Sequence, residues 1–205
     1  MHFSAKLKQF RNTVISIAFI VTILVLVISL LLPQRYSSEA KVLIVQRQTA
    51  SLDAYLATKS AEKVGQMLTE VVYSSSFFDK VWNSGYNIGT DWGENERERR
   101  DLWRQRMALS MVPQTSLLKV TAYHTDKPTA ERITQAVVYV LTQQGEEYYG
   151  ATENLQIKLV DRPINSRFPV KPNIIVNTVL GLIVGVMIGM LYVYFKPWVR
   201  RSENQ

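Results

Sequence analysis

Two uncharged apolar stretches, residues 14–32 and 174–195, lie near the two ends of a 205-residue chain whose middle is polar. At a rise of about 1.5 Å per residue, each stretch is long enough as a helix to cross a hydrocarbon core of about 30 Å. The first stretch is longer than the core of about 7 to 15 residues that signal peptides carry, so we expect a retained anchor. The pattern therefore predicts two transmembrane helices, with residues 33–173 forming one domain between them.

Basic residues flank both stretches on the sides that face the chain ends: Lys6, Lys8, Arg11, Lys196, Arg200 and Arg201. Residues 33–173 nearly balance their charges, so most of the net charge of +7 lies at the two ends. Such clusters favour the cytoplasmic side and contact anionic lipid headgroups. We therefore expect the tails 1–13 and 196–205 in the cytoplasm and the domain outside it. The same distribution predicts the lipid bilayer as a partner and argues against nucleic acid.

Glycines recur at every fourth position of the second stretch, at Gly181, Gly185 and Gly189. This spacing places them on one face of a helix, where the missing side chains allow another helix to approach closely. Two uses of this face stay open, namely homo-oligomerisation and packing against the first transmembrane helix.

In the central segment, stretches with the two-residue spacing of apolar positions typical of strands alternate with stretches that have the spacing of helices. Alternating and β-branched residues predict strands, at 36–46, 108–112, 117–124 and 155–160. Apolar residues that return every three or four positions predict helices over 52–72 and 126–149. A capping box formed by Ser76 and Asp79 predicts a short helix that ends before Gly85. These elements predict an α/β extracytoplasmic domain, a small sheet covered by helices, between the two transmembrane helices.

Residues 94–107 alternate in charge and are almost wholly polar, which predicts a solvated helix with pairs such as Glu96 and Arg100. A polyanion-binding surface on its arginines is the alternative interpretation. The acidic neighbours of these arginines favour the solvated face.

The chain offers few residues for catalysis. It has no cysteine, which excludes disulfides, thiolate metal sites and cysteine nucleophiles. Of its two histidines, His2 lies in the N-terminal tail and His124 ends a predicted strand, where we expect a surface or hydrogen-bonded ring. The sequence lacks the phosphate-binding, dinucleotide-binding and hydrolase motifs. We predict no catalytic residue, no cofactor and no metal site, and therefore a function that is not enzymatic.

Four segments carry a resemblance to a known family: LLPQRYSSEAKVLI, SSSFFDKVWNSGYNI, LLKVTAYHTDKPTAERITQAVVYVL, and VDRPINSRFPVKPN with the GLIVGVMIG that follows. They resemble the chain-length determinant (Wzz-type) family, the polysaccharide co-polymerases of bacterial surface-polysaccharide assembly. The most characteristic part is a proline-containing segment just before a glycine-patterned second span, here with Pro163, Pro169 and Pro172. Ser166 stands where the family commonly has a further proline.

The resemblance implies a co-polymerase or adaptor of the bacterial inner membrane that modulates the polymerisation, chain length or export of a surface polysaccharide, whether O-antigen, capsule or exopolysaccharide. It implies as partners further copies of the chain, a polysaccharide polymerase and a separate cytoplasmic tyrosine kinase. The chain lacks room for the long helical extension of the lipopolysaccharide regulators, so its size resembles the short adaptors of capsular and exopolysaccharide systems. The residues alone leave a second class open, a two-span sensory or scaffold protein with a ligand-binding extracytoplasmic domain.

The segment 163–172 joins the predicted domain to the second span. Each proline fixes its own φ and restricts the residue before it, so the segment is expected to be extended rather than helical. An extended connection transmits position better than a flexible one, which predicts that the segment couples the domain to the membrane helix. The alternative is that the prolines only stop the helix from continuing into the domain.

Overall fold

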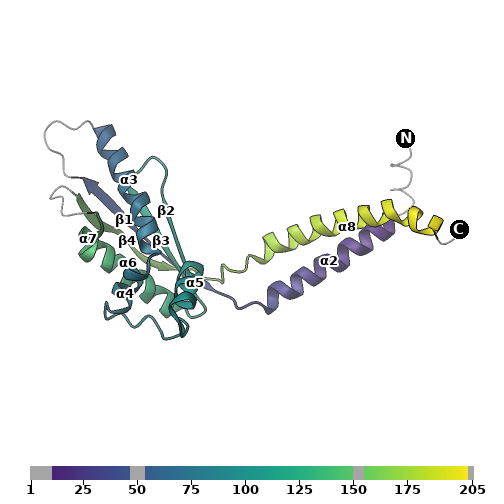
Figure 1. Ribbon diagram of the computed structural model, residues 1–205, viewed down its shortest axis with the longest axis horizontal. Coiled ribbons are helices and arrows are strands. Elements are labelled where there is room, and N and C mark those ends of the chain that lie inside the picture. The colour runs from purple at the N-terminus through teal and green to yellow at the C-terminus, as the bar shows by residue number, and fades with distance from the viewer. Residues whose placement is uncertain (1–10, 47–53, 150–154, 203–205) are drawn as a thin grey trace. The chain divides into compact units, whose positions relative to one another are not determined.

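The computed structural model describes residues 11–46, 54–149 and 155–202 (Figure 1). The chain divides into two compact units. Residues 1–34 and 171–205 form the first unit, here called the helix pair, and residues 35–170 form the second, here called the domain. The predicted extracytoplasmic segment and the two predicted spans thus fall largely into different units. Most of the predicted cytoplasmic tail 1–13 lies outside the described residues.

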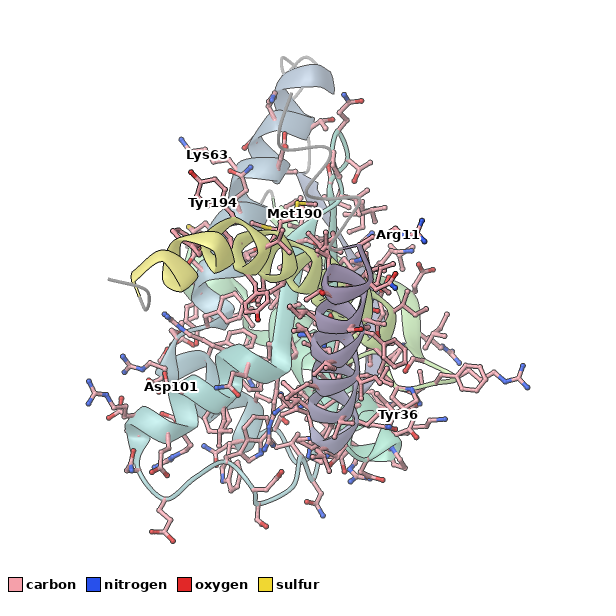
Figure 2. All side chains as sticks on the ribbon, turned by 90° about the vertical axis from the view of Figure 1, so that its right-hand side faces the viewer. Arg11, Tyr36, Lys63, Asp101, Met190 and Tyr194 are labelled. Carbon is pink, nitrogen blue, oxygen red and sulfur yellow. The ribbon has the colours of Figure 1, made fainter. Side chains whose placement is uncertain are left out.

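The helix pair consists of α2 (Arg11–Leu31) and α8 (Ile174–Ser202), which pack against each other along their length (Figure 1). Helix α2 and the part of α8 over Ile174–Phe195 are both long and apolar enough to cross a membrane. Exposed side chains such as those of Met190 and Tyr194 project from α8 (Figure 2). The positions of the two predicted spans agree with these helices.

Four strands of the described part of the domain form one antiparallel sheet in the order β2-β3-β1-β4. Their bounds are Met107–Met111 for β2, Leu117–His124 for β3, Tyr36–Gln46 for β1 and Leu155–Asn165 for β4. Strands β1 and β3 have the predicted bounds, whereas β4 runs five residues beyond its predicted end and includes Pro163. A strand can hold a proline there because β4 lies at the edge of the sheet, where one row of N–H groups needs no strand partner.

Helices cover one face of this sheet (Figure 1). They are α3 (Ala54–Val72), α4 (Ser75–Trp82), α5 (Glu96–Arg106), α6 (Lys127–Gln144) and the short α7 (Glu146–Tyr149). Helix α6 contacts β1, β3 and β4, while α3 contacts β1 and β2. The described domain is therefore a small antiparallel sheet with helices packed against it.

The two faces of the sheet differ in chemistry. Alternate residues of β1 and β3 point toward the helices and are fully buried, including Val42, Ile44 and Val120. The residues between them form the opposite face, where Lys41 pairs with Asp161 at 3.2 Å and Lys119 pairs with Glu39 at 3.7 Å. One dry face and one solvated face are typical of an antiparallel sheet.

Three details of the predicted helices are wrong. The cap of α4 is Ser74, whose Oγ accepts a hydrogen bond from the Phe77 N–H at 3.2 Å, and not Ser76. The helix predicted over 126–149 ends at Gln144, and α7 follows as a separate turn. The polar helix α5 begins after its cap Asn95 and buries Trp103 on one side, so its solvated character holds only for the other side.

Candidate functional site

The glycines predicted to form a packing face lie against α2. A Cβ atom added at Gly185 would lie 2.7 Å from the Cα of Ala18, and one added at Gly189 would lie 3.1 Å from the Cα of Val14. The first distance would be a clash with the backbone of α2, and the second is closer than an ordinary van der Waals contact. The described face of these glycines is therefore occupied by the first helix of the same chain, which is one of its two predicted uses, and homo-oligomerisation stays a prediction.

A hydrogen bond also joins the two helices of the pair. The Asn177 side-chain amide donates to the Ser29 Oγ at 3.0 Å, and Ser29 is 2% exposed. A polar pair between apolar helices is stable because each group satisfies the other where water is excluded. This pair was not predicted, although an asparagine inside an apolar stretch is a sequence signal for such a contact.

The prolines predicted to couple domain and membrane do not form one cluster. Pro163 belongs to strand β4, Pro169 follows it within the domain, and Pro172 belongs to the helix pair. Residues 166–173 are not helical. The segment has the predicted absence of helix, but its prolines occupy three different settings.

Backbone hydrogen bonds hold the last residues of the domain against the first. The Ser166 N–H donates to the Ser37 carbonyl at 2.8 Å, and the Val170 N–H donates to the Arg35 carbonyl at 2.8 Å. The Lys127 ammonium group at the start of α6 donates to the carbonyl of Arg167 at 2.9 Å. The segment before the second apolar helix is thus fixed to the segment after the first one, within the domain.

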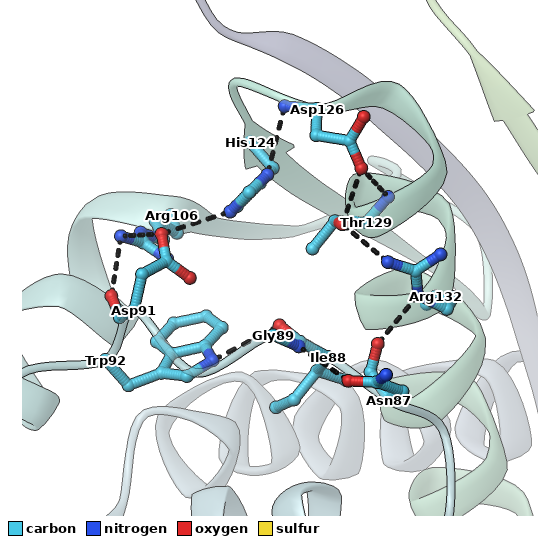
Figure 3. Close-up of polar contacts among 10 residues, drawn as sticks. All are labelled: Asn87, Ile88, Gly89, Asp91, Trp92, Arg106, His124, Asp126, Thr129 and Arg132. Carbon is cyan, nitrogen blue, oxygen red and sulfur yellow. Dashed lines mark hydrogen bonds and ion pairs between the residues drawn. The ribbon is translucent and has the colours of Figure 1, made fainter.

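His124 belongs to a polar network at the end of β3 (Figure 3). Its Nδ1 accepts a hydrogen bond from the Asp126 N–H at 3.0 Å, and its Nε2 lies 3.3 Å from Asp91 Oδ2. The Arg106 guanidinium lies 2.9 Å from the same carboxylate oxygen. Because both ring nitrogens are engaged and the ring is buried, His124 is a hydrogen-bonded structural residue, as its place at a strand end predicted.

Hydrogen bonds and neighbouring charges lower the pKa values of the two carboxyl groups in this network. Partial burial alone would raise the pKa of Asp91, but the hydrogen bond and charge of Arg106, together with His124, outweigh it and lower the pKa. Hydrogen bonds from the Thr129 side chain and backbone N–H lower the pKa of Asp126, which caps α6. Both carboxylates are therefore held in the charged form.

The network ties a loop to the start of α6. Arg132 on α6 donates to the Asn87 carbonyl at 2.6 Å and to the Thr129 Oγ1 at 2.6 Å (Figure 3). Gly89 in this loop has a φ of +85°, a conformation that other residues rarely adopt. Hydrogen bonds from Arg106 to the Asp91 carbonyl and from Arg132 to the Asn87 carbonyl thus hold the 87–92 loop against the rest of the domain.

A cleft of about 260 Å³ lies between α4 and α5. At its rim, Arg100 donates to the Ser75 Oγ at 2.9 Å and to Glu96 Oε1 at 2.8 Å, which confirms the predicted pair of Glu96 and Arg100. Arg99 lines the cleft, and its Nε is buried without a hydrogen-bond partner among the described residues. The arginines of α5 stand out in the sequence, but the cleft was not predicted because α4 lies apart from them in the chain.

Other charged side chains of α5 lie outside the cleft. Asp101 is exposed on this helix (Figure 2), and so is Arg97. Acidic residues lie on the same helix, so the described part of α5 presents charges of both signs to solvent. This is the solvated face that its alternating charges favoured.

Among the described residues, no group of three His, Cys, Asp or Glu side chains could hold a metal ion. A comparison with models of protein families gives no match, and a comparison with curated proteins gives none either. The function must therefore be argued from the residues, the fold and the sites described above.

Proposed function

We propose that this chain is a non-enzymatic membrane protein that modulates the polymerisation, chain length or export of a bacterial surface polysaccharide, as a co-polymerase or a short adaptor. Support comes from the four sequence segments that resemble the Wzz-type family and from two helices that are long and apolar enough to cross a membrane. The proposed location is the inner membrane, with both chain ends in the cytoplasm and the domain outside it.

One observation carries this proposal furthest: the chain segments that lead to the two apolar helices are hydrogen-bonded to each other. Strand β1 follows α2 and strand β4 precedes α8 after short connections, and the two strands are neighbours in the sheet. The bonds at Arg35 and Ser37 extend this pairing toward both connections. A shift of β4 against β1 would therefore be passed to the connections of both helices, which is what a protein that couples an external domain to a membrane assembly requires.

The proposed partners are further copies of the chain, a polysaccharide polymerase and a cytoplasmic tyrosine kinase. A domain tethered in a membrane meets other copies at a high effective concentration, so weak contacts between domains suffice for assembly. The proline-containing segment, with Pro169 and Pro172, would then link contacts between domains to the helix pair.

Deleting the gene and sizing the surface glycans of the bacterium tests the function. We expect a changed length distribution or amount of one polysaccharide, restored by the wild-type gene. Unchanged glycans in the deletion strain would contradict the proposal and would favour the sensory or scaffold class.

A double substitution of Pro169 and Pro172 by alanine tests the coupling. We expect altered polysaccharide length or amount at a normal protein level, because the connection loses two fixed φ angles. Pro113→Ala is the matched control, since Pro113 is exposed in the turn between β2 and β3. Normal polysaccharide from the double variant would contradict the coupling and would mean that the prolines only stop the helix from continuing into the domain.

Reporter fusions test the topology. A phosphatase fused after Gln205 should be inactive, and a fusion within the domain should be active, because only the domain is proposed to lie outside the cytoplasm. Phosphatase activity at Gln205 would contradict the proposed orientation.

A further inference from the structure

The bend that follows strand β4 exposes a large apolar side chain beside a cation. Phe168 is 70% exposed, and in the described part of the domain only one large apolar side chain, that of Ile164 at 71%, is as exposed. The Arg167 side chain is exposed too, and its Cζ lies 5.6 Å from the centre of the Phe168 ring. Its guanidinium forms no ion pair and no hydrogen bond among the described residues. Both side chains are therefore accessible to a partner.

Backbone contacts hold this bend in place. On one side of it, the Ser37 N–H donates to the Ser166 Oγ at 3.0 Å. On the other side, the Val170 N–H donates to the Arg35 carbonyl at 2.8 Å. The fold thus fixes the chain around residues 167 and 168 while their side chains stay exposed. A phenylalanine ring in water adds nothing to the stability of the domain, so the arrangement favours a contact outside the domain.

The chain itself keeps this bend near the two apolar helices. Phe168 lies six residues before Ile174, where α8 begins, and Arg35 lies four residues after Leu31, where α2 ends. An extended chain covers at most about 3.6 Å per residue, so Phe168 stays within about 22 Å of the start of α8. When the helix pair crosses a membrane, the lipid headgroups are therefore within reach of the bend.

The charges around the bend fit the phosphate groups of lipids. Residues 162–173 and 32–38 contain no acidic side chain and four basic ones, namely Arg35, Arg162, Arg167 and Lys171. Residues 39–161, in contrast, contain more acidic than basic side chains. The basic excess is thus confined to the two segments next to the apolar helices, where an anionic lipid surface attracts it.

A ring beside a guanidinium also fits the chemistry of the membrane interface. Apolar rings enter the boundary between headgroups and acyl chains, and a guanidinium binds phosphate through paired hydrogen bonds. The same bend of a second copy is a poor partner, because it carries the same basic segments and would be repelled. A lipid surface therefore satisfies both side chains better than that contact between copies does.

We propose that Arg167 and Phe168 form a membrane-contact site of the domain, in which the Phe168 ring enters the interface and the Arg167 guanidinium binds a lipid phosphate group. The site rests on the proposed insertion of the helix pair in a membrane, and it is independent of the polysaccharide and of the family resemblance. It would hold the end of β4, and with it the paired strand β1, at the lipid surface.

Fluorescence quenching on the full chain in lipid nanodiscs tests this site. The chain has no cysteine, so the single substitution F168C can carry an environment-sensitive dye, and nitroxide groups on the lipid headgroups quench the dye on contact. W82C places the same dye at an aromatic residue of the domain that is 45% exposed. V184C, at an exposed residue of α8, tests membrane insertion with nitroxides on the acyl chains.

We expect headgroup nitroxides to quench the dye at position 168 and not the dye at position 82. In discs with anionic lipid, Arg167→Gln should lower the ratio of lipid-bound to water-exposed dye about fivefold, which corresponds to about 1 kcal/mol for one basic residue near an anionic surface. Zwitterionic lipid in place of anionic lipid should lower this ratio as well. Arg97→Gln, at an exposed arginine of α5, should leave it unchanged.

Equal quenching at positions 168 and 82 would overturn the proposal. Equal ratios in Arg167→Gln and Arg97→Gln would overturn it too, because the dye or the chain connection alone would then keep the bend near lipid. Energy transfer between dyes at position 168 of two copies, without quenching by lipid, would assign the bend to a contact between copies and overturn the lipid site.

The outcome is separable from that of the other proposals. An unquenched dye at position 184 would contradict the membrane insertion and overturn the lipid site with it. A quenched dye at position 184 with an unquenched dye at position 168 would overturn the lipid site alone. Quenching at position 168, in a protein whose deletion leaves the glycans unchanged, would support the lipid site and contradict the polysaccharide function.

Discussion

The helix pair and the domain place their large apolar side chains in opposite ways. In the helix pair, large side chains face outward, with Leu31 80% and Ile175 78% exposed, while the buried positions hold small residues such as Ala18. In the domain, large side chains form the buried core, where Trp92 and Trp103 are each 1% exposed. Apolar surface leaves water in a soluble core but stays outside in a lipid environment, where small residues form the helix contacts.

This contrast predicts opposite sensitivities. The domain should lose stability when a large buried side chain is shortened, because a cavity remains. The helix pair should be disturbed when a small residue is enlarged, because the two backbones are in contact. Substitutions of Trp103 and Gly185 test the two sides of this difference, and a helix cap and a carboxylate of the domain should then give smaller effects.

Trp103→Ala should destabilise the domain most. It removes a buried ring that packs against Phe78 and leaves the Val72 carbonyl without its donor, so we expect a loss of about 3–5 kcal/mol in the free energy of unfolding. Denaturant unfolding of the full chain followed by near-ultraviolet circular dichroism measures this loss. Trp82→Ala, at a tryptophan that is 45% exposed, is the control and should cost much less. Equal losses would show that burial does not govern the stability of this domain.

Gly185→Leu should separate α2 from α8, at a cost of about 1–3 kcal/mol typical of overpacking. The chain has no cysteine, so a pair introduced as S29C and N177C can report the separation through its disulfide yield. Val184→Leu, at a residue that is 47% exposed, should leave the yield unchanged. A fall in oligomer mass by light scattering with an unchanged disulfide yield would assign the glycines to contacts between copies instead.

Ser74→Ala should cost about 1 kcal/mol, because it removes the cap of α4. Ser76→Ala should cost less, since Ser76 is exposed and its hydroxyl shares a hydrogen bond of 3.1 Å with the Tyr148 hydroxyl rather than capping the helix. Urea unfolding of the two variants side by side measures the difference. A larger loss for Ser76→Ala would restore the cap position that the sequence favoured.

Substitution of Asp91 should have the smallest effect on the free energy of unfolding, and only at acid pH. Its pKa is lowered in the folded protein, so its contribution to stability is complete above the unfolded value of about 4 and is lost as the pH falls toward the folded pKa. Its side chain is 54% exposed, so solvent screening keeps this contribution below about 1 kcal/mol. Asp91→Asn should flatten the loss of unfolding free energy below about pH 4, and Asp101→Asn serves as the exposed control. If the wild type and Asp91→Asn lost the same free energy of unfolding below about pH 4, the Asp91 carboxylate would not contribute to stability.

Local patterns were enough to predict most elements of the chain. The apolar stretches and the bounds of β1 and β3 follow from the spacing of apolar residues along the chain. The choice between Ser74 and Ser76 as a cap did not, because serines of one run have the same capping propensity, and Ser74 is the one that caps the helix burying Phe77 and Phe78. Strand β4 was predicted too short because Pro163 suggests an end, and its extension depends on pairing with β1.

The sequence by itself determined where the two apolar helices lie and that glycines form one face of the second helix, because these features depend on neighbours along the chain. Tertiary structure decided what that face contacts, namely Ala18 and Val14 of α2. It also brought Asp79 of α4 and Arg99 of α5 to the same cleft. Contacts between residues distant in the chain depend on how helices and strands pack, and a residue's own pattern carries no information about its partner.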